Sequence, residues 1–257
     1  MTKLILVQPE LSHVAGMGNL TTLMQLLDAD KAALAPTDIV LLPEHTVLES
    51  SRELYVRGMS ELARKLGCHV VAGSHHQARG ATKVNAGVVC DARGQVIAEY
   101  EKLRPYASER QRVEEGTMLG ELNIGELRVL ILICADFWFS DVFVRAKVLP
   151  DLVLVPAHSV SRKPTPDYSR ALWRHLSVAR AYEFGVFVGV SDWAHVHVPG
   201  LLAPSGVAGF ADPTTQLDSE LFTPLAHHSV QAFELDLNKL KSFRDDRRAR
   251  GFFWKSQ

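Results

Sequence analysis

The sequence predicts a mixed α/β protein (α+β class) in which helices are layered over β-sheet. Short runs rich in aliphatic and β-branched residues recur along the chain, and segments with helical periodicity lie between several of them. One pair of runs is joined by the turn sequence "DARG", which is typical of a hairpin. Because a hairpin pairs antiparallel strands, we expect a sheet that is not purely parallel.

Each expected strand is a short apolar run bounded by residues that favour turns. In chain order the runs cover residues 4–8, 38–44, 69–74, 86–100, 127–135, 151–157 and 186–193. The run at 86–100 contains both strands of the hairpin. Residues 195–222 are rich in Gly and Pro, so they predict loops with a short strand or two.

The segments between the strands include clear helix patterns. Residues 19–34 carry leucines at helical spacing. Residues 49–67 open with a capping candidate and end at a glycine, and residues 167–185 also end at a glycine. Since the sequence shows no linker and no internal repeat, we expect a single domain over residues 1–257.

Composition excludes several classes of partner. The net charge of -1 argues against a surface built for nucleic acid. The apolar run at 129–135 is far shorter than the roughly 18 residues of a membrane span, and no secretory signal is visible, so we expect no membrane partner and a cytoplasmic location. The 3 cysteines form no C-x-x-C pair, which fits a reducing compartment. We expect the basic tail at 241–255 to be a solvated terminal helix or loop.

Three potentially reactive side chains stand at or just beyond the ends of hydrophobic runs. Glu44 follows "DIVLLP", Lys102 follows "VIAEYE" and Cys134 ends "VLILI". Strand ends at one edge of a sheet can bring such side chains into one crevice. A thiol needs a base, which Glu44 would supply if burial raised its pKa, while Lys102 would stabilise an oxyanion. Taken singly, the residues also fit a loop acid, a surface charge and a small buried hydrophobe.

The settings of these residues resemble the motifs of the nitrilase, or carbon–nitrogen hydrolase, superfamily. "DIVLLPEHTV" is similar to the family's strand ending in Pro-Glu, "GQVIAEYEKLRPY" to its strand ending in Tyr-x-Lys, and "LRVLILICADFWFSD" to its strand ending in Ile-Cys-x-Asp. "WRHLSVARAYEFG" and "APSGVAGFADPTTQL" resemble later elements of the family in the same order. The resemblance covers nearly the whole chain.

The resemblance implies a four-layer αββα sandwich that pairs into a homodimer or a higher homo-oligomer. It implies hydrolysis of a non-peptide C–N bond, with an amidase acting on a small amide as the leading interpretation, through a thioester on Cys134 and with release of ammonia or an amine. Glu44 would be the general base and then the acid, and Lys102 the stabiliser of the tetrahedral intermediate. A second Glu often positions the Lys in this family, and Glu109 is the candidate. No cofactor is implied.

Residues after the cysteine depart from the family pattern. Ala135 stands in the Tyr position and Trp138 in the Arg position of the Tyr-Asp-x-Arg-Phe found in many amidase members. Trp138 would form either an apolar pocket wall or a buried structural residue. Asp136 matches the family and is expected to support the turn after Cys134. His158, which follows the next strand, would line the pocket or be a partly exposed histidine.

Alternative functions and ligands complete the expectations. A nitrilase or an N-carbamoyl amide hydrolase of the same family is the first alternative, and a non-catalytic binding protein on this fold is the second. The partner would be a small-molecule amide, nitrile or carbamoyl substrate. No G-x-G-x-x-G or Walker loop is present, so we expect no nucleotide cofactor. His195 and His197 would share a face if they lay on a strand, but no Cys or acid stands at zinc-like spacing, so we expect no metal.

Overall fold

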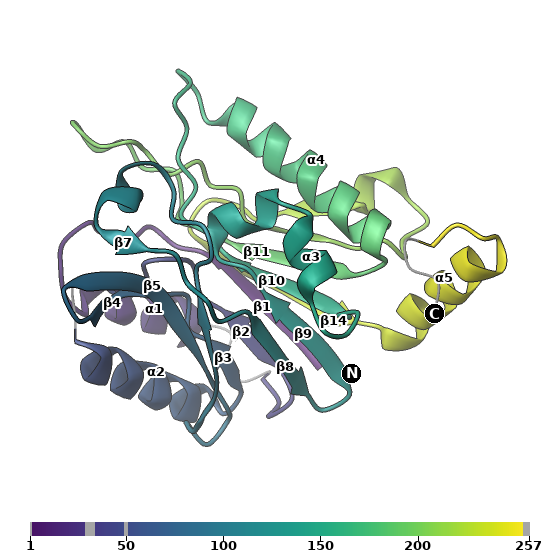
Figure 1. Ribbon diagram of the computed structural model, residues 1–257, viewed down its shortest axis with the longest axis horizontal. Coiled ribbons are helices and arrows are strands. Elements are labelled where there is room, and N and C mark those ends of the chain that lie inside the picture. Colours follow the sequence, from purple (N-terminus) through teal and green to yellow (C-terminus); the bar gives the residue numbers. More distant parts are fainter. Residues whose placement is uncertain (1, 29–33, 49–50, 254–257) are drawn as a thin grey trace.

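The computed structural model describes residues 2–28, 34–48 and 51–253, which form two stacked β-sheets with helices on both outer faces (Figure 1). Helices α1 (Gly18–Asp28) and α2 (Arg52–Leu66) cover one side, and α4 (Asp167–Phe184) covers the opposite side. A short helix, α3 (Asp141–Arg145), precedes α4. The predicted mixed α/β fold and its αββα layering are confirmed. Residues 29–33 and 49–50, at the ends of two predicted helices, lie outside the described residues.

The first sheet has the strand order β14-β1-β2-β3-β5-β4, with β6 and β7 also paired to β5. Strands β1, β2 and β3 run parallel, and β5 and β6 form the predicted antiparallel hairpin. The strands are β1 (Thr2–Gln8), β2 (Ile39–Leu41), β3 (His69–Val71), β4 (His75–Arg79), β5 (Thr82–Cys90), β6 (Val96–Glu101), β7 (Val113–Glu114) and β14 (Ser229–Leu235).

The second sheet has the strand order β13-β12-β11-β10-β9-β8. Strands β9, β10 and β11 are neighbours in this sheet and run parallel to one another. The strands are β8 (Gly120–Ile124), β9 (Leu127–Ile131), β10 (Leu152–Pro156), β11 (Phe187–Ser191), β12 (Gly209–Ala211) and β13 (Phe222–Pro224). Strands β12 and β13 arise at and just after the Gly- and Pro-rich segment, where a short strand or two was predicted.

Both faces of the first sheet are apolar, which explains its nearly continuous hydrophobic runs. In β1, Leu4 and Leu6 belong to the core shared with the second sheet, whereas Ile5 and Val7 belong to the core beneath α1 and α2. This division follows from the alternation of side chains along a strand. At Gly189 of β11 an added Cβ would lie 2.5 Å from Leu4 Cδ2, so a side chain at this position would require the leucine to move.

Helix ends follow the signals in the sequence. The side chain of Ser51 accepts a hydrogen bond from the backbone N–H of Leu54 and caps the start of α2. Gly67 and Gly185 end α2 and α4 with φ values of 69° and 60°, a left-handed conformation that costs glycine little. No helix in the described part of the chain combines the length and apolarity that crossing a membrane requires.

The C-terminal helix, α5 (Leu237–Ala249), includes the first part of the tail for which a solvated helix or loop is predicted, but the prediction that this part is simply solvated is wrong. Arg244 is buried, and its guanidinium donates to Asp151 Oδ1 at 2.6 Å and to the carbonyl oxygen of Pro150 at 2.5 Å. A buried guanidinium requires such partners, so these contacts fasten α5 to the start of β10. Residues 254–255 of the predicted tail lie outside the described residues.

Candidate active site

The strand-end residues singled out in the sequence meet between the two sheets. Glu44 follows β2 and Lys102 follows β6, both in the first sheet, while Cys134 follows β9 in the second. The three are 1%, 2% and 8% exposed, respectively. Parallel strands deliver the residues after their carboxyl ends to one edge of a sheet, and stacking two such sheets brings both edges together.

Two carboxylates and one ammonium form the centre of this site. Lys102 Nζ donates to Glu44 Oε1 at 2.7 Å and to Glu109 Oε2 at 2.6 Å. The Asn85 amide also joins both carboxylates, at 2.8 Å to Glu44 Oε1 and 2.8 Å to Glu109 Oε1. Glu109 is the second acid expected from the sequence. It lies in the 3-10 helix Ala107–Gln111 and contacts the lysine directly. The lysine and the asparagine together hold the two acids in fixed positions.

The remaining contacts of Glu44 fix its orientation. Its Oε2 accepts a hydrogen bond from the backbone N–H of His158 at 3.2 Å. Its backbone carbonyl accepts a hydrogen bond from Trp193 Nε1 at 2.7 Å. These donors come from the segments after β10 and β11, so the second sheet positions the acid that the first sheet carries.

Cys134 lies at a strained turn. It begins the 3-10 helix Cys134–Trp138 with φ of 46°, a left-handed conformation that costs a residue with a Cβ about 1 kcal/mol or more. Its Sγ is 3.9 Å from the carbonyl oxygen of His158. The sharp change of direction from strand to 3-10 helix presents the thiol at the strand end, as a nucleophile requires.

The charges of the site set the protonation states of its acid and thiol. Burial raises the pKa of the Cys134 thiol well above its ordinary 9.0, and the negative charge of Glu44 adds to this effect. Burial alone would also raise the pKa of Glu44, but the Lys102 ammonium and His45 outweigh it and hold that pKa below the ordinary 4.5. The condition considered from the sequence, a Glu44 pKa raised by burial, is therefore not met. The resting site pairs a neutral thiol with an ionised carboxylate.

These pKa directions predict a value of kcat/KM that is constant between about pH 7 and about pH 8.5. The pKa of Glu44 lies below 4.5 and that of Cys134 above 9.0, so neither group titrates in that range. As the pH falls through about 6, Asp136 gains a proton because burial raises its pKa to about 6, and Glu44 follows at lower pH, so kcat/KM falls in two steps. The measurement is kcat/KM over this range in buffers of constant ionic strength. A first step that persists in Asp136→Asn would instead indicate an essential histidine.

Asp136 connects the cysteine turn to the lysine loop. Its carboxylate accepts hydrogen bonds from the backbone N–H groups of Leu103 at 3.0 Å and Arg104 at 2.8 Å. Burial raises the pKa of Asp136 to about 6, so the group is mostly ionised at pH 7. The sequence predicts that Asp136 supports the turn after Cys134, and the hydrogen bonds of its carboxylate go to the residues directly after Lys102.

Replacing Asp136 by Asn is therefore expected to act at a distance from the reacting atoms. One of the two N–H groups would face an amide NH₂ in place of an oxygen, so we expect a loss of about 1–3 kcal/mol in the free energy of unfolding. A displaced Lys102 should also lower kcat by roughly tenfold. Urea denaturation and steady-state kinetics measure the two effects. Asp167→Asn is the matched control, because the Asp167 side chain is 78% exposed and its ion pair lies within α4.

A cavity of about 440 Å³ opens over the thiol. Its wall includes Ala135, Trp138 and His158, the further residues singled out from the sequence. Trp138 is 38% exposed and meets Trp173 edge-on at 5.6 Å between ring centroids, so it stands at the cavity wall and is not a buried structural residue. The rest of the lining combines aromatic and aliphatic side chains with serines and two cations: Tyr106, Phe139, Tyr168, Trp173, Val160, Leu172, Ser159, Ser161, Ser169, Arg162 and Lys163.

The His158 ring is packed against Trp193, with 4.5 Å between ring centroids. Burial lowers the pKa of His158 to about 3, so the ring is neutral at physiological pH. The backbone of this residue contacts both Glu44 and Cys134, as described above. His158 therefore shapes the cavity without contributing a charge.

The site also contains residues for which the sequence predicted no role. Asn85 on β5 bridges the two acids. His76 Nε2 lies 3.2 Å from Glu109 Oε1. On β4 the alternation of side chains turns His75 toward Tyr55 and leaves His76 facing the site. The His195–His197 segment is not a strand, so those two side chains do not share a strand face.

Comparison with solved structures supports the fold. Nit3 from Saccharomyces cerevisiae, a member of branch 10 of the nitrilase superfamily, superposes with a TM-score of 0.78 at 19% identity, over 95% of this chain and 93% of that one. XC1258 from Xanthomonas campestris, a CN-hydrolase superfamily protein with an arsenic adduct in its active site, gives 0.76 at 21% identity, over 99% and 98%. A mutant of the amidase from Nesterenkonia sp. AN1, with acrylamide added to its active site cysteine, gives 0.73 at 18%, over 98% and 100%.

Sequence comparison identifies the family. No curated protein matches the chain in a sequence search. The family model described as carbon-nitrogen hydrolase matches residues 6–229, which include all the site residues described above. The protein therefore belongs to the carbon-nitrogen hydrolase family.

Proposed function

We propose that this carbon-nitrogen hydrolase is an amidase that cleaves a small amide through a thioester on Cys134. The observation that carries the proposal is the buried cluster in which Lys102 joins Glu44 and Glu109 beside the thiol and the cavity. The cluster combines a nucleophile, a base whose pKa lies below neutral pH and a fixed positive charge. A binding protein on this fold has no need of all three.

In the acylation half of the proposed mechanism, Cys134 Sγ attacks the amide carbonyl carbon while Glu44 takes the thiol proton. The Lys102 ammonium and the backbone N–H that follows Cys134 stabilise the oxyanion that forms on the carbonyl oxygen. Glu44 then gives its proton to the amide nitrogen, the C–N bond breaks, and ammonia or an amine leaves. Because the thiol pKa is high and that of Glu44 is low, the proton moves only as the S–C bond forms.

In the deacylation half, a water molecule attacks the thioester carbonyl carbon. Glu44 takes a proton from that water, and the same donors stabilise the second oxyanion. The C–S bond breaks, the thiolate recovers the proton from Glu44, and the carboxylic acid product leaves. Glu109 takes no proton in this scheme. It positions the Lys102 ammonium, which its Oε2 contacts at 2.6 Å.

The test is a substrate panel of amides, nitriles and N-carbamoyl compounds read out as ammonia release, with Cys134→Ala as the control. We expect release from amides by the wild-type protein, none by Cys134→Ala, and a mass increase on Cys134 with an electrophile such as iodoacetamide. Release from nitriles or N-carbamoyl compounds alone would assign the protein to the alternative branches. Equal behaviour of both proteins, together with an unlabelled Cys134, would contradict an enzymatic role.

The aromatic lining of the cavity predicts a preference for apolar acyl groups. Trp138→Ala is expected to raise KM for an amide with a bulky apolar acyl group roughly tenfold more than KM for acetamide. The reason is that acetamide is too small to contact the Trp138 ring at the cavity wall. KM values for both substrates provide the measurement, and Phe252→Ala, which removes an exposed aromatic ring outside this cavity, is the control. Equal changes in both KM values would count against Trp138 as a specificity residue.

The homo-oligomeric assembly, the cytoplasmic location and the single domain over residues 1–257 stay predictions. Sedimentation equilibrium on the full chain measures the first of them. We expect a mass of at least two chains at micromolar concentration.

A further inference from the structure

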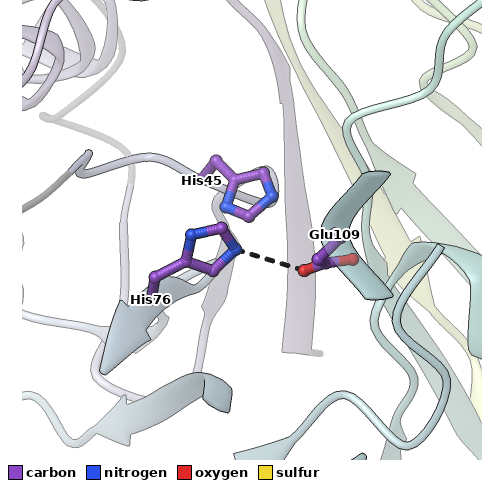
Figure 2. Close-up of side chains that lie close together, drawn as sticks. All are labelled: His45, His76 and Glu109. Atoms are coloured by element: carbon purple, nitrogen blue, oxygen red, sulfur yellow. Dashed lines mark hydrogen bonds and ion pairs between the residues drawn. The ribbon is translucent and has the colours of Figure 1, made fainter. Parts of the chain in front are cut away.

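A second set of ligand-bearing side chains lies beside the proposed catalytic cluster. His45, His76 and Glu109 each offer one potential metal-binding atom, and these atoms all lie within 4.8 Å of one another. Figure 2 shows the two imidazole rings and the carboxylate converging from separate segments of the chain. The side chains of His45, His76 and Glu109 are 14%, 28% and 10% exposed, respectively, so His76 is the most accessible of the three to an ion from solvent.

The geometry of the three groups suits zinc. Two imidazoles and one carboxylate are a common three-ligand set for Zn²⁺, with water in the fourth position. At Zn–N and Zn–O distances of about 2.0–2.1 Å, tetrahedral ligand atoms lie roughly 3.3 Å apart. His76 Nε2 and Glu109 Oε1 are already 3.2 Å apart, and the His45 ring lies 4.7 Å from the His76 ring between centroids. A small movement of the His45 side chain would complete the set.

Two further observations favour a cation here. Glu44 and Glu109 share the single ammonium of Lys102, and within the described residues no other lysine or arginine forms an ion pair with either acid. The His45 and His76 rings also lie near these acids, at 3.7 Å from Glu44 Oε1 and 3.2 Å from Glu109 Oε1, so with neutral imidazoles the cluster carries one uncompensated negative charge. In addition, His45 Nδ1 is without a hydrogen-bond partner in the part of the chain that the structure describes, so no hydrogen bond at that nitrogen has to break when the ring moves toward an ion.

We propose that His45, His76 and Glu109 form a zinc-binding site whose occupation inhibits the enzyme. The binding stands independently, whereas the inhibition rests on the proposed function. Glu109 uses Oε2 to hold the Lys102 ammonium and Oε1 to contact Asn85 and His76. A divalent cation on Oε1 withdraws this carboxylate from Asn85 and repels the adjacent ammonium. Lys102 then no longer occupies the position from which it would stabilise an oxyanion.

Sequence spacing gave no sign of this site, because its ligands are distant in the chain. His45 follows β2, His76 lies on β4, and Glu109 belongs to the loop after β6. The expectation of no metal considered only ligands close together in the sequence. The backbone of His45 has a φ of 56°, which lies in the left-handed region. Histidine and asparagine adopt this conformation more readily than most other residues with a side chain.

Isothermal titration calorimetry with ZnCl₂ tests the binding. The full-length Cys134→Ser protein is the reference, because it lacks the thiol that could bind zinc by itself. We expect one Zn²⁺ per chain, with affinity at least tenfold weaker when either His76→Gln or His45→Asn is added. Asn keeps the left-handed backbone at position 45 accessible, so the second variant remains informative if the first does not fold. His175→Gln, an exposed change on α4, should leave the affinity unchanged.

Equal zinc affinity in the reference and in both folded histidine variants would overturn the site, as would the absence of stoichiometric binding to the reference. Inhibition is tested separately with Cys134 intact. We expect His76→Gln to raise the zinc concentration for half-inhibition at least tenfold relative to His175→Gln. An unchanged value would show that zinc acts elsewhere, for example on the thiol. Calorimetry needs no turnover, so a failure of the proposed amidase activity would leave the binding result readable.

Discussion

Glu44→Gln is expected to lower kcat by about 10³-fold or more, because general-base catalysis contributes up to about 10⁴-fold and an amide cannot take the thiol proton. The substitution keeps the shape of the side chain. Its amide oxygen can still accept from Lys102 and Asn85, which both contact Oε1 in the structure. The amide NH₂ would face the backbone N–H of His158, which now donates to Oε2. We therefore expect a folded protein with little turnover.

A second measurement separates loss of the base from general damage. Glu44 is one of the groups that raise the pKa of the Cys134 thiol, whereas Lys102 lowers it. Removing the negative charge of Glu44 should therefore lower the thiol pKa, and iodoacetamide should alkylate Cys134 at a lower pH even as turnover falls. Glu126→Gln, an exposed change in the β8–β9 turn, is the control. If turnover is retained, or if the thiol pKa rises, Glu44 is not the base.

Lys102→Met is expected to affect both stability and catalysis. The Lys102 side chain is 3% exposed and compensates the charges of Glu44 and Glu109, which are nearly as buried. Removing one partner of a buried ion pair typically costs about 3–5 kcal/mol, since the remaining charges lose their compensation. The loss of the positive charge at the oxyanion should also lower kcat by about 10²–10³-fold. Urea denaturation and ammonia release measure the two effects.

The destabilisation by Lys102→Met should depend on pH. In the wild-type protein the pKa of Glu109 is held well below 4.5 by His76 and Lys102 against the effect of burial, so its contribution to stability is present above pH 4.5 and is lost as the pH falls. Without the lysine, burial favours protonated acids. The difference in unfolding free energy between the two proteins should therefore be larger at pH 7.5 than at pH 5. Lys241→Met, an exposed change on α5, should show no such dependence.

Local signals in the sequence were sufficient to predict most of the helices and strands. The capping serine and terminal glycine of α2 predicted that helix closely, because both act through backbone groups within one turn. The turn at 91–94 predicted the β5–β6 hairpin for the same reason. Apolar runs such as residues 4–8 predicted strands but not their neighbours. Both faces of such a strand are apolar, so the sequence does not show which face packs against a helix and which packs against another sheet.

The tail shows where a sequence pattern was misleading. Interspersed acids and bases at 241–255 are typical of a solvated helix, but Arg244 and Arg247 of α5 are both buried. Arg244 lies in a buried contact with Asp151, some 90 residues earlier in the chain. No local property of the sequence distinguishes this arginine from its neighbours. Arg244 is buried because α5 packs against the start of β10.

The sequence by itself determined the chemistry available to this protein: a strand-end Glu, Lys and Cys in family order, and Glu109 as a second acid near the lysine. The tertiary structure decided how these groups act together. Only the pairing of distant strands in the first sheet brings Lys102 close enough to Glu44 to reverse the effect of burial on its pKa. The same sheet brings His45 and His76 to Glu109. The physical reason is that Coulomb interactions and ligand geometry depend on distances in space, and segments far apart in the chain set those distances.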